Sequence, residues 1–406
     1  MFNVLRRVTA GIGVCFGIAF ALASAPAHAQ ELKIGALYPF SGGLALLGDE
    51  SFRGVQLTVD ERNAAGGING RQITLVKADA VDASQAVGEA RRLTSVENVA
   101  AVFGSYASGI SQAATQVTEL AGVPYFELGA TADTITGRGF KYLFRINPTA
   151  KNIGDRTLEA LVKVVAPTLK VDPKTLKIAI IHEDGPYGSL VGAAQKEEAK
   201  RLGLNVVEAQ AYSAKTVDLS SVILRLKGAG ADLVLHTAYQ NDAVLFFRQA
   251  AAAGYKPRAV IGGGGGYSLT DTAQAVGAPM EGVYDVDFPQ ITMNPAGAPG
   301  LNDFVVAYQK KFSSAPRSGH SLANYVGAKA MLEVLARAKS TDKDKIREAA
   351  LAYRAPVGST AAGWGVQFGE TGQNSLATLN LMQWQQGKLA TVFPESVATV
   401  KPIASN

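Results

Sequence analysis

LKIGAL, at residues 32–37, and PFSGG, at residues 39–43, decide how this chain begins to fold. A short apolar run that ends at a proline and two glycines is typical of a buried strand, because proline and glycine interrupt regular structure. Phe52, Val55 and Val59 then recur at helical spacing and predict a helix with one apolar face. A buried strand followed directly by such a helix is the beginning of a βαβ unit.

The same alternation continues along the chain and starts again after Asn147. Strands are expected at residues 73–76, 99–103, 123–126, 176–181, 233–235 and 259–261. Helices are expected at residues 86–96, 109–121, 190–202, 243–253, 300–312, 321–338 and 344–352, and strand-like segments at 379–381 and 389–393. Strands that alternate with helices form parallel sheets, so two successive runs predict an α/β protein with two doubly wound lobes.

The length and the charge of the chain fit this architecture. The 406 residues are too many for one ordinary core and fit two lobes. The formal net charge is +5, of which Arg6 and Arg7 contribute two, and the other basic residues are scattered along the sequence. Nucleic-acid binding needs a concentrated basic face, and no apolar segment after residue 29 is long enough to span a bilayer. We therefore expect a soluble mature protein that binds no nucleic acid.

Residues 1–29 have the pattern of a secretory signal peptide. Arg6 and Arg7 precede an uncharged apolar stretch at residues 8–25, and AHA at residues 27–29 supplies the small-x-small cleavage pattern. A transmembrane anchor is disfavoured because the apolar run ends in this cleavage pattern. We expect cleavage after Ala29 and export of the mature chain to the periplasm.

The single cysteine, Cys15, lies inside this segment. Lipidation would need a small residue before the cysteine, but Val14 occupies that position and apolar sequence continues afterwards. The mature chain would then contain no cysteine, which excludes a disulfide, a thiol nucleophile and a cysteine-ligated metal.

Candidate binding residues follow the predicted strands. Ligands of open parallel sheets bind beyond the carboxyl ends of the strands, where helix N-termini offer unpaired N–H groups. Ser108 opens a helix after one strand, and Gly129 and Thr131 follow the next strand, so these three residues form a candidate cradle for a carboxylate. Ser108 is equally suited to an ordinary N-cap role. Tyr187 and Tyr239 follow two strands of the second run and are either surface tyrosines or aromatic walls with polar tips.

An enzyme is disfavoured. The histidines after the signal segment are His182, His236 and His320, and their separations do not match metal-ligand spacing. The sequence contains neither a G-x-S-x-G elbow nor a G-x-x-x-x-G-K-[ST] phosphate loop. The five glycines at residues 262–266 lack the following lysine of a phosphate loop, so we expect a flexible loop or a close approach of the backbone. No catalytic residue, cofactor or metal is expected.

Four motifs point to a known family. They are IGALYPFSG at residues 34–42, NAAGGING at 63–70, GAT at 129–131, and II at 180–181 leading to Tyr187 and Gly188. In this order they resemble the periplasmic branched-chain amino-acid-binding proteins of ABC transporters, the leucine/isoleucine/valine-binding family, from residue 31 to the C-terminus. The same fold also serves amide-sensing regulators and receptor ectodomains, so the resemblance does not name the ligand.

The resemblance implies a periplasmic-binding-protein type I fold, in which two lobes joined by three crossing segments close around one ligand. The crossings would fall near residues 145–146, 283–285 and 358–362. The first lobe would comprise residues 30–146 and 284–357, and the second lobe residues 147–283 and 358–406. By motif position the ligand-binding residues would be Ser108, Gly129, Ala130, Thr131, Tyr187 and Tyr239, together with Leu47 and Gly264. The closed protein, a monomer without a nucleotide site, would deliver its ligand to a membrane permease.

The chain departs from the family pattern at three points. Leucine-type members carry an acidic residue after the last strand of the second lobe, which pairs with the ligand's ammonium group, whereas this chain has Gly264 within the glycine run. Burying an ammonium without a charged partner is costly, so Asp242 or Asp287 would have to replace that acid. Leu47 stands where the family has an aromatic pocket wall, and the small disulfide of some members is absent.

Two ligand classes follow from these departures. The leading interpretation is a transport receptor for a branched-chain or other aliphatic amino acid. The rival is the same role for an aromatic or other organic carboxylate without an ammonium group, because the glycine run would make room for a ring. A ligand-sensing ectodomain is disfavoured because no membrane-spanning or signalling segment follows the two runs.

Overall fold

The computed structural model of the chain describes residues 1–2 and 31–404. The predicted signal peptide, its cleavage after Ala29, and Cys15 fall on residues 3–30 and so lie outside the described residues. Among the helices that are described, none has both the length and the apolar character needed to cross a membrane.

The first lobe is built on a five-stranded sheet. Its strands are β1 (Leu32–Tyr38), β2 (Ile73–Asp79), β3 (Ala101–Gly104), β4 (Tyr125–Glu127) and β5 (Leu143–Arg145). Their order is β2-β1-β3-β4-β5, and every neighbouring pair is parallel. The strands are short and apolar because both faces of the sheet are covered.

Helices cover the two faces of this sheet. The elements concerned are α1 (Ala45–Ala64), α2 (Ala83–Ser95), α3 (Ser108–Ala121), α11 (Gly319–Ala338) and α12 (Lys343–Ala352). α1 packs against α11, and α2 packs against α3. Ile34 of β1 shares one apolar cluster with Val55 of α1, while Leu37 of the same strand shares another with Leu93 of α2. α1 and α2 therefore lie on opposite faces, as the alternation of side chains along a strand requires.

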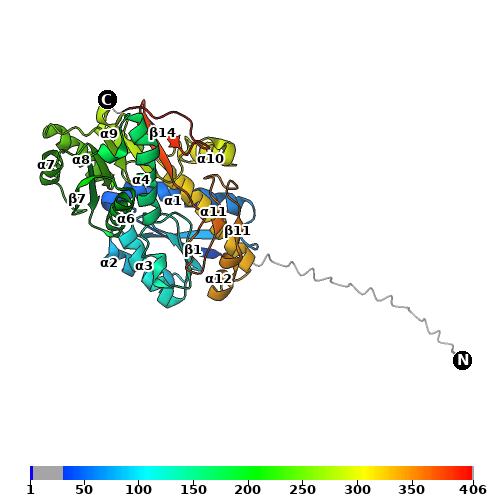
Figure 1. The fold of residues 1–406 in the computed structure, drawn as a ribbon. Coiled ribbons are helices and arrows are strands. Elements are labelled where there is room, and N and C mark those ends of the chain that lie inside the picture. The colour runs from blue at the N-terminus through cyan, green and yellow to red at the C-terminus, as the bar shows by residue number, and fades with distance from the viewer. Residues whose placement is uncertain (3–30, 405–406) are drawn as a thin grey trace.

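The second lobe is built on a seven-stranded mixed sheet (Figure 1). Its strands are β6 (Ile178–Glu183), β7 (Val206–Tyr212), β8 (Leu233–Thr237), β9 (Ala259–Gly262), β10 (Tyr284–Asp287), β13 (Asn380–Gln385) and β14 (Lys388–Phe393). The order is β14-β13-β10-β9-β8-β6-β7. The pairs from β7 to β10 are parallel, whereas β13 runs antiparallel to both β10 and β14.

The remaining elements connect and cover the sheets. The helices are α4 (Ala150–Ala160), α5 (Ala166–Thr168), α6 (Pro186–Leu202), α7 (Ser220–Gly228), α8 (Gln240–Ala252), α9 (Thr270–Val276) and α10 (Leu301–Phe312). A short ladder joins β11 (Arg354–Ala355) to β12 (Val366–Gln367). Single turns of 3-10 or π-helix lie at Gly42–Leu44, Thr136–Arg138, Leu161–Val165, Pro173–Thr175, Ala278–Met280 and Pro295–Gly297.

The prediction of an α/β protein with two wound lobes is confirmed, but the chain crosses between the lobes later than expected. Tyr284–Asp287 were expected to open the second part of the first lobe, yet they form β10 and pair with β9 and β13 of the second sheet. Near the last crossing, the Arg145 N–H of β5 donates to the carbonyl of Gly372 at 2.8 Å, and Phe368 packs on Phe144 with ring centroids 5.5 Å apart. Residues 366–374 therefore still lie beside the first sheet. The lobe bounds as a whole stay a prediction.

Candidate ligand-binding site

The carboxyl ends of the two sheets face each other and enclose a small cavity. The residues that line it are Tyr106, Ser108, Gly129, Thr131, Ile153, Tyr187, Tyr239, Gly263, Gly264, Gly265, Asp287, Phe288 and His320. The enclosed space is about 20 Å³, room for about one water molecule. A small-molecule pocket takes roughly 300 Å³ or more, so this conformation leaves too little room for an organic ligand.

The first lobe contributes hydrogen-bond donors. Ser108 is the first residue of α3, where unpaired backbone N–H groups and the helix dipole favour an anion. Its Oγ accepts a hydrogen bond from the Ala132 N–H at 3.1 Å, which joins the start of α3 to the loop after β4. The Oγ1 of Thr131 in that loop is buried without a hydrogen-bond partner in the described part of the chain. A buried hydroxyl in this state is costly unless a ligand pairs with it.

Glu127 accepts hydrogen bonds from both loops that form this cradle. Its Oε1 accepts the N–H groups of Ser105, Gly129 and Ala130 at 2.8, 2.8 and 2.7 Å, and its Oε2 accepts the hydroxyl of Ser111. Burial raises the pKa of Glu127, and these hydrogen bonds oppose that rise. Glu127 thus ties the loop after β3 to the loop after β4.

The second lobe contributes aromatic walls. Tyr187 lies in the first turn of α6, and its hydroxyl donates to the carbonyl of Gly263 at 2.6 Å. Tyr239 caps α8, and its ring lies 5.3 Å from that of Tyr187 and 6.1 Å from that of Tyr106 in the first lobe. Burial raises the pKa of all three tyrosines well above the usual range, so they stay neutral and keep their hydroxyl protons.

The glycine run is a closely packed loop. The Gly264 N–H donates to Asp285 Oδ1 at 2.9 Å, and φ of Gly264 is +90°, a conformation that residues with a Cβ rarely adopt. A Cβ at Gly264 would stand 3.1 Å from Asp287 Oδ1, and one at Gly266 would stand 2.3 Å from the backbone of Tyr239. The prediction of a close approach is confirmed. The space above Gly264 is occupied by the carboxylate of Asp287.

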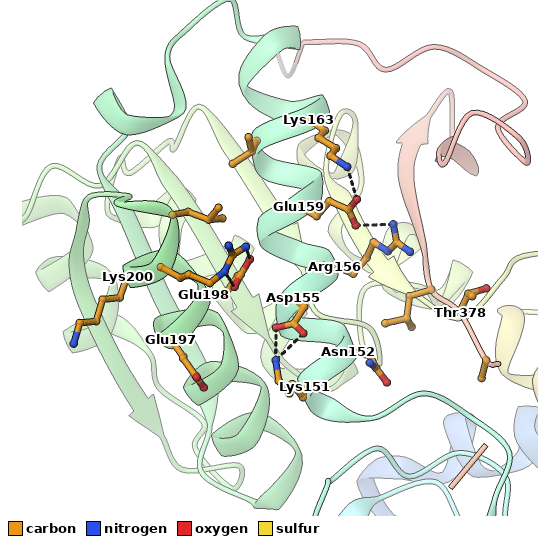
Figure 2. Close-up of a pocket in the computed structure, with 15 residues that line it drawn as sticks. Lys151, Asn152, Asp155, Arg156, Glu159, Lys163, Glu197, Glu198, Lys200 and Thr378 are labelled. Atoms are coloured by element: carbon orange, nitrogen blue, oxygen red, sulfur yellow. Dashed lines mark hydrogen bonds and ion pairs between the residues drawn. The ribbon is translucent and has the colours of Figure 1, made fainter. Parts of the chain in front are cut away.

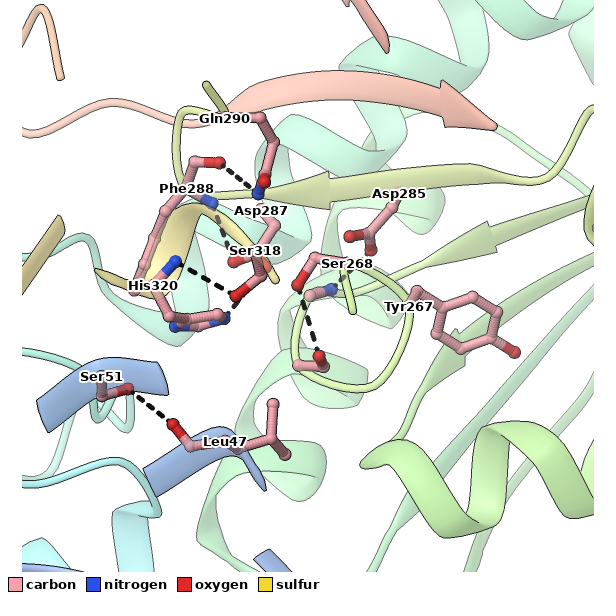
Figure 3. Close-up of polar contacts among 12 residues, drawn as sticks. Leu47, Ser51, Tyr267, Ser268, Asp285, Asp287, Phe288, Gln290, Ser318 and His320 are labelled. Carbon is pink, nitrogen blue, oxygen red and sulfur yellow. Dashed lines mark hydrogen bonds and ion pairs between the residues drawn. The ribbon is translucent and has the colours of Figure 1, made fainter. Parts of the chain in front are cut away.

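Asp287 is the carboxylate that faces the cavity (Figure 3). Its Oδ1 accepts the Phe288 N–H at 2.7 Å, and its Oδ2 lies 3.1 Å from Nε2 of His320, which is carried by α11 of the first lobe. Asp285 is fully buried two residues earlier on β10, and its burial together with the charge of Asp287 raises its pKa well above the usual range. Asp285 is therefore held neutral, and Asp287 is the carboxyl group of this strand end that lines the cavity.

Six of the eight residues predicted from the sequence line this cavity, and two do not. Leu47 lies in an apolar cluster with Leu269 and Tyr106, and the N–H of Ala130 donates a hydrogen bond to Glu127. Of the two acids considered as substitutes, Asp287 lines the cavity. Asp242 instead accepts a hydrogen bond from the Tyr212 hydroxyl at 2.6 Å inside the second lobe.

Tyr106, Asp287, Phe288 and His320 lie at the cavity although the strand-end argument did not select them. Tyr106 stands two residues before Ser108 in the same loop, so that argument applied more widely would have found it. Asp287 ends β10 and Phe288 follows it, and the sequence did not predict this strand. His320 opens α11 and comes near Asp287 only through the packing of the two lobes, which no local signal reports. Within the described residues no group of three or more histidine, cysteine or acidic side chains is arranged to hold a metal ion.

A larger groove, of about 990 Å³, lies between α4, α6 and residues 377–379 (Figure 2). Its charged side chains pair with one another, as Lys151 does with Asp155 at 2.8 Å and Lys163 with Glu159 at 2.7 Å. Cations and anions are mixed in its lining, which shares no residue with the cavity at the strand ends. Its size alone does not make it the better candidate, so we place the ligand site at the small cavity.

Comparisons with known proteins agree with the fold. A family model described as "Periplasmic binding protein" matches residues 31–388. The chain is 53% identical to "Leu/Ile/Val-binding protein homolog 8" of Brucella suis biovar 1 (strain 1330), over 96% of this chain and 97% of that protein.

Solved structures share the fold at low sequence identity. The branched-chain amino acid transporter substrate binding protein LivJ from Streptococcus pneumoniae, in complex with isoleucine, is 24% identical with a TM-score of 0.76, covering 92% of this chain and 100% of that chain. A solute binding protein from R. palustris in complex with 4-hydroxybenzoate is 20% identical with a TM-score of 0.77, covering 93% and 98%.

Proposed function

The chain belongs to the periplasmic binding protein family, and on that premise we propose that it is the solute-binding protein of an ABC importer for a small α-amino acid of the branched-chain type. In this proposal residues 1–29 direct export to the periplasm, and the monomeric mature chain delivers its ligand to a membrane permease. The observation that carries the proposal is Asp287, a single carboxylate that faces a cradle of donors across the cavity.

The opposed groups match a zwitterion. The hydroxyl groups of Ser108 and Thr131 and the N-terminus of α3 would take the ligand's carboxylate. Asp287 would take the ammonium group and supply the charge that the glycine run lacks. No lysine or arginine is among the residues that line the described cavity. An acid without an ammonium would therefore bring a second negative charge next to Asp287, which costs free energy in a buried site.

The remaining lining fits an aliphatic side chain. Ile153, Phe288 and the rings of the three tyrosines surround the polar groups, so an apolar group of the ligand would be buried on closure. The Brucella relative's name, which refers to leucine, isoleucine and valine, supports the same class. Each lobe carries part of the site, so ligand binding would favour the closed state.

Three compounds that differ by one charged group test this proposal. Thermal unfolding of the mature chain, after refolding to remove carried-over ligand, is measured with L-leucine, 4-methylpentanoate (no ammonium) and 3-methylbutylamine (no carboxylate). A ligand at about a hundred times its Kd stabilises by about 2.7 kcal/mol, so we expect a clear rise in Tm with L-leucine alone. Equal stabilisation by 4-methylpentanoate would contradict the role of Asp287.

The rival class is included in the same screen. The 4-hydroxybenzoate complex of the R. palustris protein gives the compound to use. If 4-hydroxybenzoate raises Tm while no amino acid does, the site takes ammonium-free acids, and the proposal of an amino-acid importer is wrong.

A further inference from the structure

Arg145 is a buried cation directly behind the donor cradle. It is the last residue of β5, its side chain is fully buried, and it stands beside Glu127 in the register of β4 and β5. Burial lowers its pKa to about 10, so the guanidinium keeps its charge at neutral pH. A buried hydrophobic residue would cost less free energy at this position, so the contacts of the guanidinium require an explanation.

The guanidinium holds the loop that carries Thr131. Nη1 of Arg145 donates to the carbonyls of Ala130 at 3.3 Å and Ala132 at 2.7 Å, the residues on either side of Thr131. On the other side of the loop, Glu127 accepts the N–H groups of Gly129 and Ala130. The backbone is thus fixed by one residue through its carbonyls and by the other through its N–H groups. Arg145 itself is not among the residues that line the cavity.

The same guanidinium contacts one of the segments that connect the lobes and reaches a second segment through Gln373. Nε of Arg145 donates to Oε1 of Gln373 at 2.6 Å, and Nε2 of Gln373 donates to the carbonyl of Asn147 at 2.9 Å. Asn147, just after β5, donates from Nδ2 back to the carbonyl of Ala130 at 3.0 Å. The cradle loop, the segment after β5 and the segment before β13 therefore form one hydrogen-bonded unit.

We propose that Arg145 is a positioning residue that fixes Thr131 for the ligand's carboxylate and couples the cradle to the segments that bend when the lobes close. This inference rests on the proposed binding of a carboxylate-bearing ligand at Thr131. The ligand touches Thr131, and Arg145 acts through the carbonyls on either side of it. Glu127 supports the loop from the opposite side as a hydrogen-bond acceptor.

Calorimetric titration tests the positioning role with L-leucine and with L-leucinamide, which lacks the carboxylate charge. We expect Arg145→Met to weaken L-leucine binding at least tenfold and L-leucinamide binding less than threefold. Arg145→Lys, which keeps the charge, should recover part of the loss. The matched control is Arg138→Met, because Arg138 is a half-buried arginine of the same lobe that donates to Gln112 rather than to the cradle. Equal losses for both compounds, or no loss for L-leucine, would overturn the positioning role.

Hydrogen exchange of the protein without added ligand tests the coupling. We expect Arg145→Met to speed exchange in residues 128–134 and in residues 372–376 together, while Arg138→Met speeds neither. Faster exchange confined to one of the two segments would refute the coupling. Gln373→Ala leaves the buried charge in place and should weaken L-leucine binding about threefold. This variant takes the place of Arg145→Met if Arg145→Met does not fold.

The two proposals fail in different ways. If the unmodified protein binds no amino acid, the proposed function fails, and the exchange experiment still decides whether Arg145 holds the loop. If the unmodified protein binds L-leucine and Arg145→Met binds it equally well, only the inference about Arg145 fails.

Discussion

Asp287→Asn isolates the charge that we assign to the ligand's ammonium group. The change keeps the size and shape of the side chain and an oxygen that still accepts the Phe288 N–H, which it does at 2.7 Å in the unaltered protein. It removes the negative charge that lies 3.1 Å from Nε2 of His320 and faces the cavity. The fold of β10 should therefore survive, and the effect should fall on ligand binding.

The expected loss follows from the burial of the carboxylate, which is 2% exposed. Removing one partner of a buried, hydrogen-bonded charge pair costs about 2–5 kcal/mol. The amide oxygen still accepts one hydrogen bond from the ammonium, so we expect the lower part of that range. About 2–3 kcal/mol corresponds to an affinity for L-leucine roughly 30- to 150-fold weaker. An ammonium-free acid should bind no worse, because the variant removes a repulsion.

Calorimetric titration of both proteins with L-leucine and 4-methylpentanoate measures this difference. Asp242→Asn is the matched control, since Asp242 is also a buried aspartate of the second lobe but is not among the residues that line the cavity. The control should bind L-leucine within about threefold of the unaltered protein. If Asp287→Asn binds L-leucine as well as the control does, Asp287 is not the ammonium partner and the reasoning from the glycine loop is wrong.

Three further predictions concern the cradle, the rim and the interior of the second lobe. Ser108→Ala should weaken binding of a carboxylate ligand by about 1.5–3 kcal/mol, the cost of a hydrogen bond to a charged group, as measured by titration calorimetry; unchanged affinity would remove Ser108 from the site. Arg317→Met removes an ion pair that joins the lobes outside the cavity, in which Nη1 of Arg317 lies 2.6 Å from Oδ1 of Asp271. Because the pair is partly exposed, the affinity for L-leucine should fall only about two- to fivefold, and the difference should shrink in high salt. Burial raises the pKa of Asp242 to about 6 from its usual 3.8, so its contribution to stability is complete below pH 3.8 and is lost as pH rises through 6. Urea unfolding should therefore show the unaltered protein losing stability relative to Asp242→Asn between pH 4 and pH 7, by on the order of 3 kcal/mol, and a constant difference would contradict the shift.

The sequence predicted the fold well wherever a strand is apolar and buried on both faces. β1, β3, β6, β8 and β9 are of this kind, and each was expected within a few residues of its observed bounds. Their runs of apolar residues report burial directly.

Strands that carry buried polar residues were missed for the opposite reason. β5 ends in Arg145, and β10 holds Asp285 and Asp287 among its four residues. Charged side chains are rarely buried, so pattern alone argues against a core strand at these positions. Each of these polar side chains is accommodated by contacts from distant parts of the chain, such as Gln373 for Arg145 and Gly264 for Asp285. The third crossing was placed too early because residues 372–374 pair with β5, a strand that had not been predicted.

The candidate site shows the same division. Ser108, Gly129, Thr131, Tyr187 and Tyr239 follow strands that the sequence revealed, and the strand-end rule was sufficient to find them. Asp287 and His320 required the tertiary structure, because β10 was hidden and α11 reaches the cavity only through packing against α1. The sequence thus pointed to the residues that we propose for the ligand's carboxylate, and it left the proposed group for the ammonium undecided between two acids.

If Asp287 takes the ligand's ammonium group as we propose, the contact between Asp287 and His320 links ligand specificity to closure. Apparent affinity equals intrinsic affinity reduced by the fraction of molecules in the competent state, so protein contacts that join the lobes set part of the affinity. The ion pair of Arg317 with Asp271 is partly exposed, and neither residue lines the cavity. The contact of His320 with Asp287 lies inside, where the ammonium group would have to reach the same carboxylate. A ligand with an ammonium group would displace His320 from Asp287 and become the new charge partner of Asp287. An acid without an ammonium group would displace His320 and leave Asp287 without a charge partner. We therefore expect discrimination between the two ligand classes to persist when Arg317 is changed and to disappear when Asp287 is changed.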